Sequence, residues 1–70
     1  MRYEISYKNS VLNITENGNH IFLKDMSSYA VNDRIQSMYD SLYAHTLIPM
    51  HEIENVLETI INTGFVLADA

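Results

Sequence analysis

The sequence predicts a single α+β domain, residues 1–70, in which three antiparallel strands precede two helices. Apolar and polar residues alternate through the first third of the chain, which is typical of a half-buried β-meander over about residues 2–24. Apolar residues then recur every three or four positions, which predicts helices over about residues 28–45 and 49–62, packed on one face of the sheet. No repeat or linker divides the chain, so one domain is expected.

Two short turns connect the predicted strands. Asn17-Gly18 is the strongest hairpin signal, because a type I′ turn needs positive φ at both central residues. Asn9-Ser10 is expected to form the other two-residue turn. The predicted pairs are Ile5 with Ile14 and Tyr7 with Leu12 across the first turn, and Ile14 with Ile21 and Leu12 with Leu23 across the second. Together with Tyr3 these side chains would form one apolar face, which a one-residue slip would destroy.

The first helix is predicted from a one-sided apolar stripe. Its members are spaced by four, three and four residues: Val31, Ile35, Met38 and Leu42. Ser27 is expected to cap the start of this helix, because its hydroxyl can accept from the free amides of the first turn. Tyr29 is expected to lie on the same helix, beside the stripe.

Pro49 separates the two helices, because proline is tolerated only in a first helical turn. The second helix is expected to bury five side chains: Ile53, Val56, Leu57, Ile60 and Ile61. Gly64 should end it in the left-handed conformation. Residues 65–68 form either a short fourth strand at a sheet edge or an apolar tail.

The net charge of −5 lies entirely in the second half of the chain. Acidic and basic side chains cancel over residues 1–34, whereas residues 35–70 hold five acidic side chains and no lysine or arginine. This distribution disfavours nucleic acid as a partner and favours a larger protein with a basic surface. There is no cysteine, signal peptide or apolar run of membrane-spanning length, so we expect a cytoplasmic protein without a membrane partner.

No catalytic constellation is visible, so we predict that the chain is not an enzyme and holds no metal or cofactor. His51-Glu52 begins like the HExxH zinc motif, but Asn55 occupies the position of the second histidine. Ser41 and His45 lie four residues apart, yet nothing resembles a nucleophile elbow or an oxyanion hole.

The predicted binding residues lie on the two helices. Glu54 and Glu58 are one turn apart and form an acidic ridge, with Asp40 on the outer face of the first helix. Tyr39 and Tyr43 widen the apolar stripe, and tyrosine is enriched at protein interfaces. We therefore predict a protein-binding modulator, such as an inhibitor, an antitoxin-like neutraliser or an adaptor, and a homodimer through the first helix is the other use of this surface.

The alternative function is a small nucleic-acid-binding regulator. The predicted register places Lys8, Phe22 and Lys24 on the polar face of the sheet, and an aromatic ring among basic residues is the plan of single-strand readers. In type, this small, acidic, cysteine-free chain resembles the inhibitors and modulators that phages and other mobile elements encode, although no motif carries the resemblance.

Overall fold

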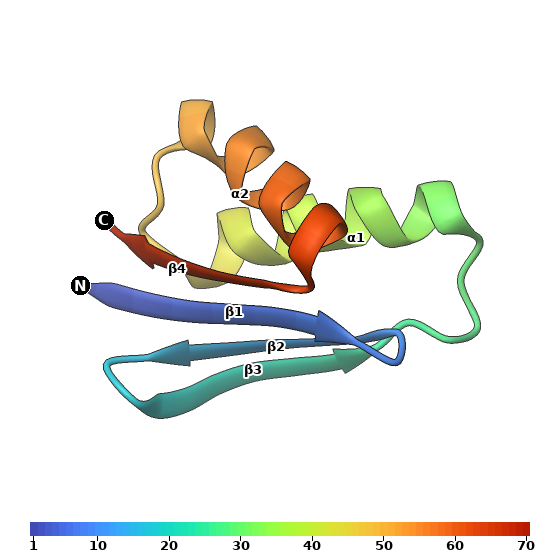
Figure 1. The fold of residues 1–70 in the computed structure, drawn as a ribbon, viewed down its shortest axis with the longest axis horizontal. Helices are drawn as coiled ribbons and strands as arrows, with labels where there is room; N and C mark the ends of the chain where they lie inside the picture. Colours follow the sequence, from blue (N-terminus) through green and yellow to red (C-terminus); the bar gives the residue numbers. More distant parts are fainter.

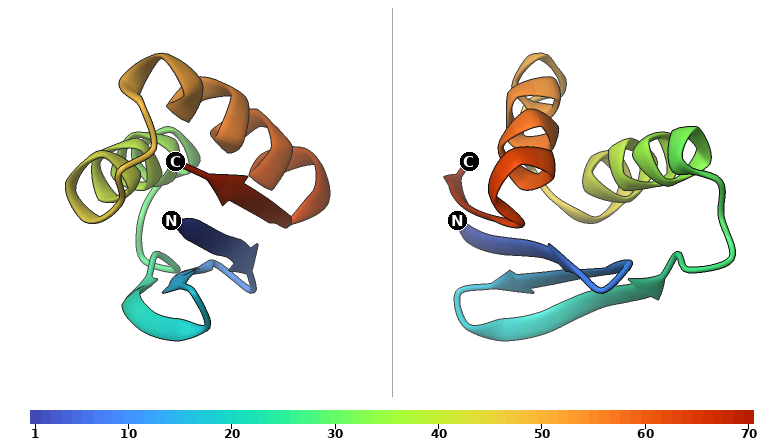
Figure 2. Two further views of the ribbon diagram at one scale, coloured as in Figure 1. Left: turned by 90° about the vertical axis from the view of Figure 1, so that its left-hand side faces the viewer. Right: turned by 45° about the vertical axis from the view of Figure 1, so that its right-hand side comes forward.

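The computed structural model describes all residues 1–70 and confirms the predicted α+β fold (Figure 1). Its elements, in chain order, are β1 (Arg2–Lys8), β2 (Val11–Glu16), β3 (Asn19–Asp25), α1 (Val31–His45), α2 (Met50–Thr63) and β4 (Phe65–Asp69). The four strands form one antiparallel sheet in the order β3-β2-β1-β4. Both helices cover the same face of this sheet (Figure 2). The last residues are thus a strand paired with β1, and the two termini lie side by side.

Both hairpin turns form as predicted. Asn9 and Ser10 have φ values of 52° and 66°, and Asn17 and Gly18 have φ values of 52° and 85°. Positive φ at both central positions is the requirement of a type I′ turn, which matches the twist of the adjoining strands. The predicted β1–β2 register is confirmed, since Ile5 pairs with Ile14 and Tyr7 pairs with Leu12.

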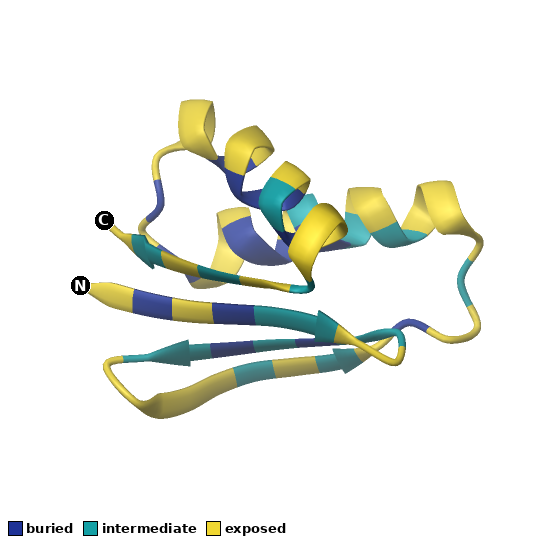
Figure 3. Cartoon of the chain, in the orientation of Figure 1, coloured by how far each residue is buried: buried dark blue, intermediate teal, exposed yellow.

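The predicted β2–β3 register is wrong. The strands pair normally next to the turn, but the register shifts by one residue between Ile14 and Thr15. Ile14 therefore pairs with Phe22 instead of Ile21, and Leu12 pairs with Lys24 instead of Leu23. A β-bulge inserts one extra residue into one strand, and every later side chain changes face. Phe22 and Lys24 consequently face the helices, while Ile21 and Leu23 are exposed. The later part of β3 alternates between half-buried and exposed residues in Figure 3.

The first helix begins three residues later than predicted, and Ser27 does not cap it. Residue Ala30 precedes the helix without a side-chain cap. The Ser27 amide instead donates to the Asp25 carboxylate at 2.9 Å, which closes a local turn. The Arg34 side chain donates to the carbonyl oxygens of Ser27 and Tyr29, and so holds this segment outside the helix. Tyr29 therefore lies before α1.

The apolar stripe of α1 is only half buried, contrary to the prediction. Met38 and Leu42 are in the core, whereas Val31 is 69% exposed and Ile35 is 38% exposed. The reason is the placement of α1, whose first turns extend past the end of α2 (Figure 1). Ile61, predicted to be buried, is also exposed, because it lies in the last turn of α2, next to the uncovered first turns of α1.

The core lies between the sheet and the helices. Its buried apolar side chains are Tyr3, Ile5, Leu12, Ile14, Met26, Met38, Leu42, Ile48, Ile53, Val56, Leu57 and Ile60. Tyr3 also links the layers, because its hydroxyl oxygen accepts from the Leu47 amide at 2.9 Å. The linker between the helices is thereby fixed over β1. No helix in the chain is long and apolar enough to span a membrane.

Gly64 connects α2 to β4 as predicted. Its φ is 78°, and its amide donates to the Ile60 carbonyl at 2.6 Å. Its own carbonyl accepts from the Tyr7 amide at 2.8 Å, so the helix end also begins the β1–β4 ladder. A Cβ atom here would lie 3.3 Å from the Tyr7 carbonyl oxygen. The site therefore requires glycine for its conformation and for its close contact.

We expect Gly64→Ala to lower the free energy of unfolding by more than Gly18→Ala, measured by urea denaturation. Each substitution costs about 1–2 kcal/mol, because both residues have positive φ. Gly64→Ala adds the displacement of Tyr7, whereas a Cβ atom at Gly18 meets no atom within 4 Å. Equal losses for the two variants would contradict the close approach of Gly64 to β1.

Burial raises the pKa of the Tyr3 phenol above its ordinary value. A raised pKa in the folded state stabilises the protein below the unfolded pKa of about 10, and this contribution is lost as the pH rises above that value and through the raised pKa of the folded state. We therefore expect the free energy of unfolding to fall as the pH rises above about 10. In Tyr3→Phe this alkaline loss should shrink, although about 1 kcal/mol is lost at neutral pH with the hydrogen bond to Leu47.

Tyr43→Phe is the matched control for Tyr3→Phe. The Tyr43 side chain is 60% exposed, so its hydroxyl lies outside the core. This variant should keep the alkaline loss of the unmodified chain. An unchanged alkaline profile in Tyr3→Phe would show that another group causes the loss.

Candidate protein-interaction surface

The two predicted tyrosines are one helical turn apart on α1 but differ in exposure. Tyr39 is half-buried and packs against the core, whereas Tyr43 is 60% exposed. Asp40 is exposed, and its carboxylate accepts from the Gln36 side-chain amide at 3.0 Å. Since Gln36 and Asp40 are also one turn apart, this bond lies along the helix surface. The outer side of α1 thus presents one anchored ring, one free ring and one carboxylate.

The structure brings Tyr39 and Glu54 together from different helices. Along with Met50 and His51 they line an open hollow of about 570 Å³ between α1 and the start of α2. Glu58 lies one turn beyond Glu54 on α2 and is exposed. Tyr39, Glu54 and Glu58 were predicted as binding residues, and two of them share this hollow.

Met50 is the binding candidate that sequence reasoning missed. It is 57% exposed, although methionine is more often found in a core. Its spacing of four residues from Glu54 predicts that both lie on one side of α2. That side could not be identified as part of a shared hollow before the position of α1 was known. A flexible thioether beside an aromatic ring adapts readily to a partner surface.

The helical layer is strongly acidic compared with the rest of the chain. Residues 31–63 hold five acidic side chains and one arginine, which accounts for −4 of the net charge of −5. The single contact between a basic and an acidic side chain in the chain joins His51 Nε2 to Glu52 Oε1 at 3.9 Å; it is an ion pair only when His51 is protonated, and both side chains are largely exposed. Such a pair contributes little to stability. Glu54, Glu58 and Asp40 have no basic partner and present their charge to solvent.

The residues of the predicted nucleic-acid face do not form one surface. Phe22 stacks on His45, with ring centroids 4.3 Å apart and planes inclined by 26°. Lys24 Nζ lies 5.0 Å from the centroid of the Tyr29 ring, which is the geometry of a cation–π contact. Lys8 lies on the opposite face of the sheet, in register with Val11. The bulge in β3 therefore separates Lys8 from Phe22 and Lys24.

Ser41 and His45 do not form a nucleophile–base pair. The Ser41 hydroxyl is buried and donates to the Ser37 carbonyl oxygen at 2.7 Å, and the His45 ring stacks on Phe22. No three histidine, cysteine, aspartate or glutamate side chains are grouped closely enough to hold a metal ion. These helical residues are therefore explained by local hydrogen bonding and packing.

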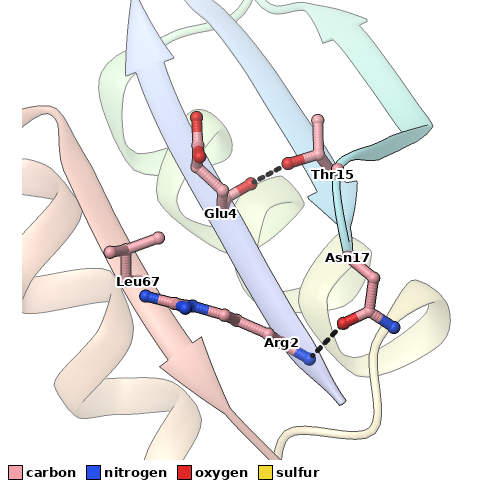
Figure 4. A pocket seen from close by; sticks show the side chains of 6 residues that line it. Arg2, Glu4, Thr15, Asn17 and Leu67 are labelled. Atoms are coloured by element: carbon pink, nitrogen blue, oxygen red, sulfur yellow. Dashed lines mark hydrogen bonds between the residues drawn. The ribbon is translucent and has the colours of Figure 1, made fainter.

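A polar hollow of about 350 Å³ lies on the uncovered face of the sheet, beside the β2–β3 turn. Figure 4 shows the Arg2 side chain extending toward Leu67, while the Glu4 side chain points away from the Arg2 side chain. The hydrogen bonds here are internal: the Arg2 amide donates to Asn17 Oδ1 at 3.1 Å, and the Thr15 hydroxyl donates to the Glu4 carbonyl at 3.4 Å. Charges of both signs and satisfied backbone groups make this a weaker binding candidate than the helical surface.

Comparison with protein-family models, with curated proteins and with solved structures finds no match to this chain. A functional proposal therefore rests on the residues themselves and on their arrangement.

The corrected β3 register predicts a large difference between two neighbouring substitutions. We expect Phe22→Ala to lower the free energy of unfolding by about 2–3 kcal/mol, less than a fully buried phenylalanine because Phe22 is half-buried. Leu23→Ala should stay within about 0.5 kcal/mol of the unmodified chain, since Leu23 is 59% exposed. Thermal and urea denaturation measure both variants. A larger loss for Leu23→Ala than for Phe22→Ala would contradict the bulge and support the register predicted from the sequence.

Proposed function

We propose that this chain is a non-enzymatic protein-binding modulator that covers a functional surface of a larger, basic protein. An inhibitor, an antitoxin-like neutraliser and an adaptor all act in this way. The observation that carries the proposal is the open hollow between the helices, which is lined by both Tyr39 and Glu54. It combines apolar contact area with unpaired charge in the most acidic part of the molecule.

The tyrosines are suited to supply the contact area. Tyrosine buries a large rigid ring, retains a hydrogen-bonding tip and is enriched among the residues that dominate binding energy. Tyr39 is already held by the core, so it loses little freedom when a partner covers it. Tyr43, one turn away and largely free, extends the same surface.

The acidic side chains are suited to guide the encounter. Complementary charge raises the association rate and selects among partners more than it adds affinity. Glu54 and Glu58 have no ion-pair partner within the chain, so their charge is available to a basic surface. A symmetric dimer through the same surface would place two acidic helical layers against each other. A basic protein is therefore the better occupant.

A nucleic-acid function has weaker support. Lys8, Phe22 and Lys24 lie on two faces, and the two that share a face contact His45 and Tyr29. Binding a nucleic acid would also have to overcome the net charge of −5.

The test is capture of partners by the tagged chain from a lysate of the cells that encode it, at low and at moderate salt. We expect one stoichiometric protein that stays bound at moderate salt. Glu54→Gln with Glu58→Gln should slow association by roughly tenfold at low salt and weaken its salt dependence. Tyr43→Ala should weaken binding by about tenfold, because it removes contact area. Biosensor kinetics with the captured protein measure both effects.

The matched control is Glu4→Gln with Asp69→Asn, which removes the same amount of charge from exposed positions on β1 and β4. It should leave association almost unchanged. Equal slowing by both pairs would mean that total charge, rather than this surface, determines the rate. Recovery of nucleic acid at low salt that is lost as salt rises would contradict the proposal and favour the alternative.

A further inference from the structure

A second hollow lies in the same helical layer and is mainly apolar. It opens between the start of α1 and the end of α2 and has a volume of about 250 Å³. We call it the helix-end groove; its lining residues are Tyr7, Val31, Arg34, Ile35, Met38 and Ile61. Three of the four aliphatic members are substantially exposed: Val31 by 69%, Ile35 by 38% and Ile61 by 53%. These are the residues with core-type spacing that the fold leaves uncovered.

The helix-end groove has a fixed wall. Arg34 Nε donates to the Tyr29 carbonyl and Nη1 donates to Ser10 Oγ, each at 2.9 Å. Nη1 also donates to the Tyr7 hydroxyl at 3.3 Å, and Nη2 donates to the Ser27 carbonyl at 3.2 Å. Four of the five N–H donors of the guanidinium are thus used within the chain. Arg34 is held as part of the wall, so the groove exists before a partner arrives.

The size and surroundings of the groove indicate what it accepts. Small-molecule pockets typically enclose about 300–1,000 Å³ and bury most of their ligand, and this open groove is smaller. Glu58 lies one turn before Ile61 on α2, and Glu54 lies one turn before Glu58, so unpaired carboxylates lead away from the groove. A partner segment would therefore need an apolar side chain for the groove and a basic residue within one or two turns.

We infer that the helix-end groove binds an apolar anchor side chain on a basic amphipathic helix of the partner protein. This inference rests on the proposed function and names the partner chemistry at the same helical surface. Helices commonly dock in grooves through apolar side chains spaced by three or four residues. Ile35 is one turn from Tyr39 on α1, so a helix lying along this surface would reach from the groove to the hollow at Glu54. A second copy is disfavoured, because both helical layers carry a charge of −4.

The direct test uses a synthetic amphipathic peptide with leucine on one helical face and lysine on the other. We expect it to shift the NMR methyl resonances of Val31, Ile35 and Ile61 in a saturable way that weakens as salt rises. Ile21 is the internal control, because it is 39% exposed but lies on β3. Ile61→Gln should weaken the binding of the peptide by about tenfold, since it removes apolar contact area at an exposed position. Leu23→Gln, a change at a similarly exposed position on the sheet, should have no effect.

Several results would overturn the inference. They are equal binding of a peptide with glutamate in place of lysine, equal binding of one with alanine in place of leucine, shifts confined to Ile21, and no saturable shift at all. If the groove resonances instead change with the concentration of the protein alone, the occupant is a second copy and the partner chemistry is wrong.

The capture assay separates this inference from the proposed function. Full retention of the captured protein by Ile61→Gln, together with slowed association in the Glu54→Gln and Glu58→Gln variant, would overturn the groove and leave the proposed function standing. Normal association of the captured protein with both variants would overturn both the groove inference and the proposed function. Weakened binding in both, with peptide shifts at the groove, would support both.

Discussion

The structure depends on the burial of one side of β1. Tyr3 and Ile5 are almost completely inaccessible, and their strand is paired on both sides, with β2 and with β4. The helices must cover this face, because a chain of seventy residues has little other apolar surface to bury. Tyr3 adds a directional constraint through its bond to the Leu47 amide, which positions the linker between the helices. The ends of α2 are consequently fixed at this linker and at Gly64.

This arrangement divides the molecule into two chemically different layers. The helices carry most of the negative charge, whereas the uncovered face of the sheet mixes acidic, basic and apolar side chains. Acidic residues on the helices have few internal partners, because the only arginine of that layer is bonded to backbone and hydroxyl oxygens. The helical layer therefore has a negative electrostatic potential that would attract a basic protein before contact.

The helical layer also contains apolar surface that its own fold does not cover. The hollow at Tyr39 and Glu54 lies near the start of α2 and the helix-end groove lies near its end, and the helices bury their shared apolar residues against the sheet. Covering Val31 and Ile35 within the chain would require α2 to extend further, but Gly64 ends it and starts β4. The exposed stripe is thus a direct consequence of using the last residues as a strand.

Local sequence determined the elements whose cause is local. Alternation defined β1 and β2, the positive-φ pairs at Asn9 and Asn17 defined the hairpins, and Gly64 ended α2. The acidic and tyrosine residues of the candidate surface could likewise be named, because helical spacing places them. The late start of α1 has a local cause too, in hydrogen bonds within residues 25–34 that helical periodicity does not reveal. Tertiary structure alone decided the bulge that turns Phe22 toward the helices and the hollow that Tyr39 and Glu54 share. Both depend on how separate strands or helices pack together, which periodicity along one segment does not encode.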